Sequence, residues 1–89
     1  MRQKEGFVLR DICGDKAVIA EGAKVVDFGK MIMMNETAAW LWEKCTELGD
    51  FTPEQLAEAL CEAYQVEPSK ALADTNRILD TWKELGLIL

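Results

Sequence analysis

Residues 30–42, KMIMMNETAAWLW, contain an apolar run typical of a strand that passes directly into a helix start. Met31–Met34 are four consecutive apolar residues, too few for a helix of their own. Asn35 follows at once, and its side-chain oxygen can cap a helix by accepting a hydrogen bond from a free amide of the first turn. The chain must therefore fold so that a short strand and a helix are joined without a linker.

Two further strands are predicted before this junction. Residues 7–13 and 16–21 are rich in β-forming side chains and are separated by Gly14-Asp15, a two-residue link with glycine first that suits a type II′ turn. Val25-Val26-Asp27 adds a short fourth strand-like piece. Together with Met31–Met34, the pattern predicts a small sheet of three antiparallel strands. Such a sheet has an open edge, which can accept the backbone of another chain.

Three helices are expected after the strands. Apolar residues recur at spacings of three and four over Glu36–Leu48, and Gly49 supplies a stop. Thr52, Pro53 and Gln55 form an N-cap pattern in which Phe51 and Leu56 can pack together as a hydrophobic staple. A third helix begins at Glu67-Pro68 and ends at Gly86, and its predicted apolar face comprises Ala71, Leu72, Thr75, Ile78, Leu79, Trp82 and Leu85.

The element order predicts an α+β fold, with a three-stranded antiparallel sheet followed by a three-helix bundle. The 89 residues suffice for a single domain spanning 1–89. No apolar run is long enough to span a membrane, and no apolar segment follows the charged N-terminal residues, so we expect a cytoplasmic protein without a signal peptide. The net charge of −6 and the lack of a Lys/Arg cluster disfavour nucleic-acid binding.

The chemistry-bearing residues do not form a pattern typical of catalysis. The chain has no histidine, and Cys13, Cys45 and Cys61 do not have the spacing of a zinc site, so we expect three buried, reduced thiols. Most carboxylates fall on polar helix faces at helical spacing. We therefore expect a protein that is not an enzyme and that needs no metal and no cofactor.

Two sets of apolar side chains allow alternative interpretations. Side chains alternate across a strand, so Met31 and Met33 share one face while Ile32 and Met34 share the other, and only one pair can face the helices. The pair left uncovered is a candidate for peptide contact.

Trp40 lies about 160° around the helix from Trp42, so it either packs against a neighbouring loop or is an exposed aromatic anchor. Trp82 is expected in the core.

These pieces resemble a known family. The segments MIMMNETAAWLWE, FTPEQLAEALCEAYQVEP and ALADTNRILDTWKELGLI are similar to PqqD-like proteins, the pyrroloquinoline quinone biosynthesis protein D family, also called RiPP recognition elements. The most specific similarity is the strand-to-helix pattern "LNE-x-A-x-x-(I/L)W", matched by residues 34–42. A closing pattern is matched in outline by Asp74, Leu79, Trp82, Gly86, Leu87 and Ile88.

The resemblance implies a winged-helix-like domain that binds the leader of a ribosomally made precursor peptide. Such a protein presents the leader to a modifying enzyme, often a radical SAM protein, in the synthesis of a PQQ-type cofactor or a peptide natural product. The leader adds as a strand, and its apolar side chains enter a groove beside the third helix. Carried onto this sequence, the peptide-binding residues are Lys30, Met31, Ile32, Met33 and Met34 on the strand and Leu72, Thr75, Asn76 and Leu79 on the helix.

Two other expectations accompany this one. A winged-helix regulator that binds DNA is the alternative function, although the acidic composition opposes it. The open sheet edge also permits a homodimer formed by strand addition, which would compete with a peptide for the same surface.

Overall fold

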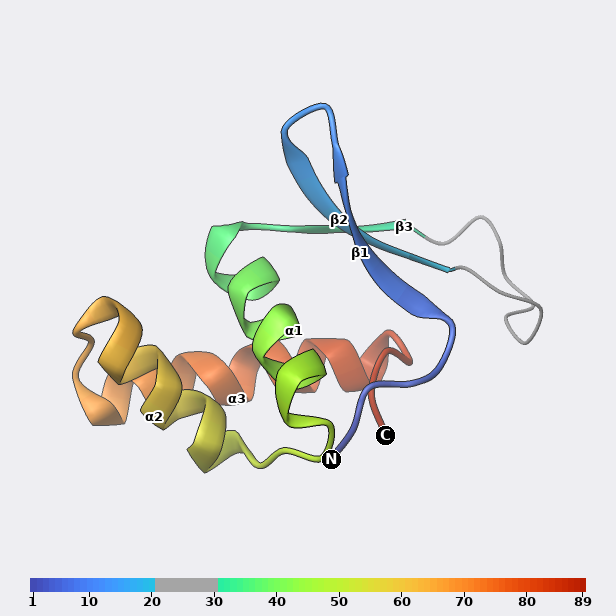
Figure 1. Cartoon of the computed structure of the whole chain (residues 1–89). Coiled ribbons are helices and arrows are strands. Elements are labelled where there is room, and N and C mark those ends of the chain that lie inside the picture. The colour runs from blue at the N-terminus through green and yellow to red at the C-terminus, as the bar shows by residue number, and fades with distance from the viewer. Residues whose placement is uncertain (21–30) are drawn as a thin grey trace.

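A computed structural model describes residues 1–20 and 31–89 of the chain (Figure 1). Three antiparallel strands, in the order β1-β2-β3, are followed by three helices, which confirms the expected α+β fold. The elements are β1 (Phe7–Ile12), β2 (Asp15–Ala20), β3 (Met31–Met34), α1 (Glu36–Leu48), α2 (Pro53–Tyr64) and α3 (Pro68–Glu84). The short strand expected at residues 25–27 lies outside the described residues, as does Lys30.

The hairpin between β1 and β2 differs from the predicted turn. Its two loop residues are Cys13 and Gly14, because Asp15 pairs with Ile12 in the sheet. Both loop residues have positive φ, 54° and 90°, which is the pattern of a type I′ turn rather than type II′. Cys13 adopts a left-handed conformation here, and the Gly14 amide donates to Asp11 Oδ1 at 3.0 Å.

The first two helices begin with the predicted caps. Asn35 accepts a hydrogen bond from the Ala38 amide at 2.8 Å, so β3 passes into α1 through a single residue. Thr52 and Gln55 form a reciprocal capping box at the start of α2. Phe51 and Leu56, the predicted staple, are both buried in one core cluster. Local sequence signals thus set both helix starts.

The end of α3 at Gly86, the predicted stop, forms a Schellman motif. Gly86 has a φ of 76°, its amide donates to the Lys83 carbonyl at 3.1 Å, and the Leu87 amide donates to the Trp82 carbonyl at 2.9 Å. Leu87 is fully buried as a result. The chain therefore turns back onto the core directly after the helix.

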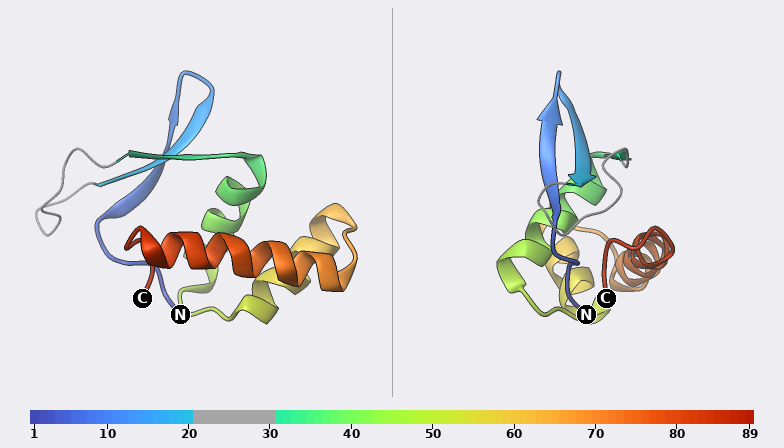
Figure 2. Two further views of the ribbon diagram at one scale, coloured as in Figure 1. Left: turned by 180° about the vertical axis from the view of Figure 1, so that it is seen from behind. Right: turned by 90° about the vertical axis from the view of Figure 1, so that its right-hand side faces the viewer.

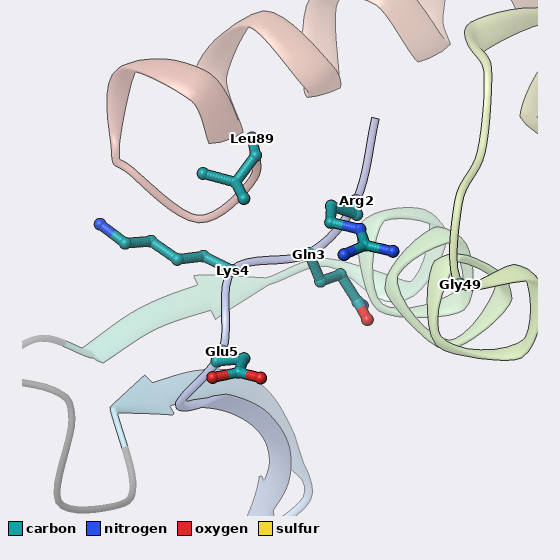
Figure 3. Close-up of a pocket in the computed structure, with 6 residues that line it drawn as sticks. All are labelled: Arg2, Gln3, Lys4, Glu5, Gly49 and Leu89. Carbon is teal, nitrogen blue, oxygen red and sulfur yellow. The ribbon is translucent and has the colours of Figure 1, made fainter.

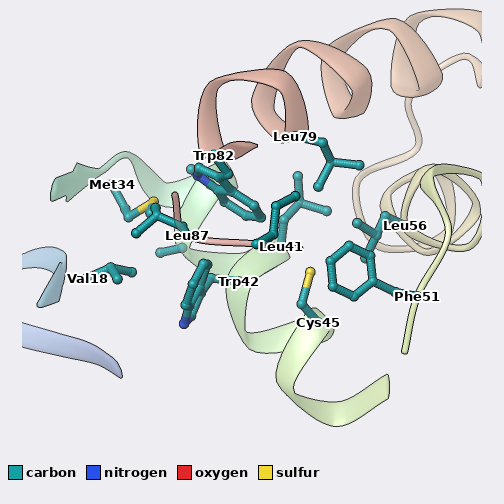
Figure 4. Close-up of a cluster of buried hydrophobic side chains, with 13 residues drawn as sticks. Val18, Met34, Leu41, Trp42, Cys45, Phe51, Leu56, Leu79, Trp82 and Leu87 are labelled. Carbon is teal, nitrogen blue, oxygen red and sulfur yellow. The ribbon is translucent and has the colours of Figure 1, made fainter. Parts of the chain in front are cut away.

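The main core lies where the sheet, α1 and α3 meet (Figure 4). Trp42 and Trp82 contact edge to face, with ring centroids 5.2 Å apart, and Trp82 is only 2% exposed, as predicted. Figures 1 and 2 show α1 leading from the sheet to α2 and α3, which pack against each other. A smaller cluster between α2 and α3 contains Ala57, Leu60 and Ala71.

The N-terminal segment connects distant parts of the chain, which the sequence patterns did not predict. The backbones of Arg2 and Asp50 form an isolated antiparallel β-bridge, and those of Gln3 and Ile88 form another. The Lys4 amide also donates a hydrogen bond to the Leu87 carbonyl at 2.8 Å. The Arg2 guanidinium also pairs with the Asp50 carboxylate at 3.0 Å. This segment thereby holds the α1–α2 link and the C-terminal residues together, and it lines the hollow shown in Figure 3.

The three cysteines occupy three different environments, so the expectation of three buried thiols was wrong for Cys13. Cys13 is exposed at the hairpin tip, Cys61 is partly buried and Cys45 is fully buried. Burial raises the pKa of the Cys45 thiol from 9.0 to about 12. A tight turn projects its residues away from the core, which explains the exposure of Cys13.

We predict that iodoacetamide at pH 8 modifies Cys13 first, Cys61 more slowly and Cys45 only after unfolding, as measured by peptide mass spectrometry. In denaturant all three should react at similar rates.

The raised pKa of Cys45 also means that the unfolded state loses this thiol proton near pH 9 and the folded state only near pH 12. The free energy of unfolding should therefore fall as pH rises through this window. If iodoacetamide modified Cys45 of the folded protein as fast as Cys13, the burial of Cys45 in the core would be contradicted.

Candidate functional site

The candidate site begins with β3, an edge strand. Its partner is β2, with Lys16 opposite Met34 and Ile19 opposite Met31. No other strand among the described residues pairs with β3. Alternate residues of an edge strand direct their N–H and C=O groups away from the sheet, where an extended chain can bond to them.

Side chains of β3 alternate as predicted. Met34 is 7% exposed and lies in the core, and Ile32 packs against the same cluster. Met31 and Met33 are 55% and 57% exposed on the opposite face. The helices therefore cover the Ile32/Met34 pair, and the uncovered pair is Met31 and Met33.

A groove lies between β3 and the C-terminal half of α3. Met34 and Trp82, one from each side, are drawn close together in Figure 4. The groove has a volume of about 250 Å³ and is largely apolar. Its lining residues are Ile32, Met33, Met34, Asn35, Ala38, Arg77, Ile78, Thr81, Trp82 and Leu85.

The four helix residues expected as the groove wall have other positions. Leu72 packs against the small α2–α3 cluster, Thr75 is fully buried, Asn76 is exposed, and Leu79 is 2% exposed within the main core. The groove is lined instead by residues further along α3, including Ile78, Trp82 and Leu85. These three belong to the apolar stripe that the sequence predicted, so the signal was present but did not show which turn faces β3.

Arg77 is the one charged side chain that lines the groove, within the described part of the chain. Its Nη2 atom donates to Asp74 Oδ1 at 3.0 Å across one helical turn. The Arg77 side chain is 74% exposed and that of Asp74 27% exposed. A single guanidinium therefore lies at the rim of an apolar hollow.

Trp40 does not lie on the groove. It packs edge to face on Tyr64 of α2, with ring centroids 5.5 Å apart, and the Lys44 ammonium lies 5.9 Å from its ring centroid. Trp40 is partly buried. Both proposed positions were therefore wrong, because its neighbour is a helix rather than a loop and the ring is not fully exposed.

A larger hollow, of about 580 Å³, lies at the N-terminal segment (Figure 3). Its lining residues, among the described part of the chain, are Arg2, Gln3, Lys4, Glu5, Gly49 and Leu89, and none of them belongs to β3. The described residues contain no group of His, Cys, Asp and Glu suited to hold a metal ion. Among them there is also no helix long and apolar enough to cross a membrane.

A family model supports the resemblance suggested by the motifs. The model of coenzyme PQQ synthesis protein D matches residues 14–88, which is most of the chain. The chain belongs to the PqqD family. The match includes all of β3, α1, α2 and α3, and thus both sides of the groove.

Solved structures share the fold of this PqqD-family chain. One, described as TbiB1 in complex with the TbiA(beta) leader peptide, has a TM-score of 0.78 at 17% identity and covers 99% of this chain and 94% of its own. Another, lasso peptide synthetase B1 complexed with the leader peptide, has a TM-score of 0.76 at 20% identity, with 99% and 95% coverage. No curated protein matches the chain.

Thr75 offers a test of how α3 is packed. Its side-chain oxygen is buried without a hydrogen-bond partner in the described structure. We predict that Thr75→Val, which keeps the side-chain shape, raises the free energy of unfolding by ~1 kcal/mol because an unpaired buried hydroxyl is costly. Urea denaturation measures the change.

Thr81→Val is the matched control for this substitution. Thr81 is exposed and its hydroxyl donates to the Arg77 carbonyl at 3.1 Å, so the effect of its replacement should be small. A loss of stability on Thr75→Val would show that the Thr75 hydroxyl has a partner and that this part of α3 packs differently.

Proposed function

We propose that this PqqD-family protein binds the leader of a ribosomally made precursor peptide at the edge of β3. The leader adds as a strand to the sheet, and its apolar side chains enter the groove between β3 and α3. The single observation that carries the proposal is this groove beside an edge strand whose outer side no described strand occupies. Backbone hydrogen bonds supply affinity and the groove supplies sequence preference.

The role is one of presentation rather than catalysis. The bound leader would be delivered to a separate modifying enzyme, for which a radical SAM protein is the expectation from the family. The two solved structures named above are complexes with a leader peptide, which supports a peptide as the ligand. No comparison favours the DNA-binding alternative.

The groove position predicts which surface substitution on α3 blocks binding. Thr81 lines the groove, whereas Asn76 is also exposed on the same helix but does not line the groove. We predict that Thr81→Trp fills the groove and weakens binding at least about tenfold, a cost of about 1.4 kcal/mol, while Asn76→Trp leaves it unchanged. The probes are synthetic leaders of precursor peptides encoded beside the gene.

Binding is measured by calorimetry and by the amide shifts of isotope-labelled protein. In the unmodified chain, the leader should shift the amides of β3 and of the C-terminal half of α3. If Asn76→Trp blocks binding and Thr81→Trp does not, the peptide uses the earlier turns of α3. If no such leader shifts the β3 amides, the proposed function fails.

A further inference from the structure

The groove combines apolar walls with one positively charged side chain. Ile32, Ile78 and Leu85 are among its apolar lining, and Arg77 is its one charged member in the described residues. The apolar methylenes of an arginine can cover such a surface while the guanidinium stays in water. A peptide seated in this groove would therefore meet a cation at its rim.

The Arg77 guanidinium has unused hydrogen-bonding capacity. A guanidinium has five N–H donors arranged to fit carboxylates. Within the described structure one of them bonds to a carboxylate oxygen, that of Asp74. A second carboxylate can therefore bind Arg77 without displacing the first.

We propose that Arg77 determines peptide specificity by selecting an aspartate or glutamate next to the apolar residue that enters the groove. This inference rests on the proposed function and names the chemistry of its ligand, an extended acidic and apolar peptide segment. In Figures 1 and 2, β3 and α3 run in opposite directions. Arg77 comes first among the groove residues of α3, so the acidic residue would lie toward the end of β3 that leads into α1.

The overall charge of the protein makes this preference diagnostic. With a net charge of −6, the chain as a whole attracts basic peptides and repels acidic ones. An acidic preference confined to one peptide position would therefore have a local origin, and Arg77 is the charged side chain that lines the groove in the described residues. The Arg77 side chain is 74% exposed, so we expect the carboxylate to improve affinity only about threefold to fivefold.

The test selects ligands from a displayed library of random short peptides on the unmodified protein. Groove ligands are those that the Thr81→Trp variant fails to capture. Their aligned sequences should show Asp or Glu at one position beside an apolar residue. The Arg77→Glu variant should replace that preference by Lys or Arg, whereas Lys83→Glu, the same charge change at an exposed α3 residue outside the groove lining, should not.

A second measurement separates specificity from helix stability. Asp74→Asn removes the carboxylate that accepts a hydrogen bond from Arg77. This substitution should tighten the binding of a Glu-containing ligand and leave the binding of the same ligand with Gln unchanged, as measured by calorimetry. Groove ligands without an acidic preference, or an acidic preference that survives Arg77→Glu, would overturn this inference and leave the proposed function standing. Failure to obtain any groove ligand would overturn both.

Discussion

The direct passage from β3 into α1 is the constraint on which the rest of the site depends. The Asn35 side chain bonds to the Ala38 amide at 2.8 Å, so a single residue ends the strand and starts the helix. Met34 is buried beside α1 residues such as Trp42, which fixes one face of β3 on the core. The strand is thus held by its side chains and by β2, and no other described strand pairs with its outer backbone. A longer linker between β3 and α1 would let β3 move relative to α3, the other side of the groove.

The opposite wall depends on how α3 ends. Trp82 contacts Trp42 edge to face, and the Schellman turn at Gly86 returns Leu87 to the core. The C-terminal half of α3 is therefore anchored to α1, which also carries β3. Pairing of the Lys4 amide with the Leu87 carbonyl adds a further restraint at the same end. Both sides of the groove are connected through one core, so its width is a property of packing rather than of a flexible loop.

Local signals predicted the elements better than they predicted the groove. The bounds of α1, Glu36–Leu48, follow directly from Asn35 and Gly49, because caps act within one turn. The turn at Cys13-Gly14 was misplaced because the cross-strand pairing of Ile12 with Asp15 decides the register. Which turn of α3 faces β3 depends on how two distant elements cross, and a helical stripe does not contain that information. The N-terminal bridges at residues 2 and 3 likewise have no periodic pattern to reveal them.

An open sheet edge is also a hazard, because it can pair with a second copy of the same chain. Two features of this protein oppose that outcome while leaving a peptide free to bind. The β3 edge has only four residues, which limits the hydrogen bonds that two copies could form there. Two copies each carry a charge of −6 and repel one another, whereas a short peptide with one or two carboxylates is repelled far less. The net negative charge that argues against DNA binding therefore also opposes pairing of two β3 edges.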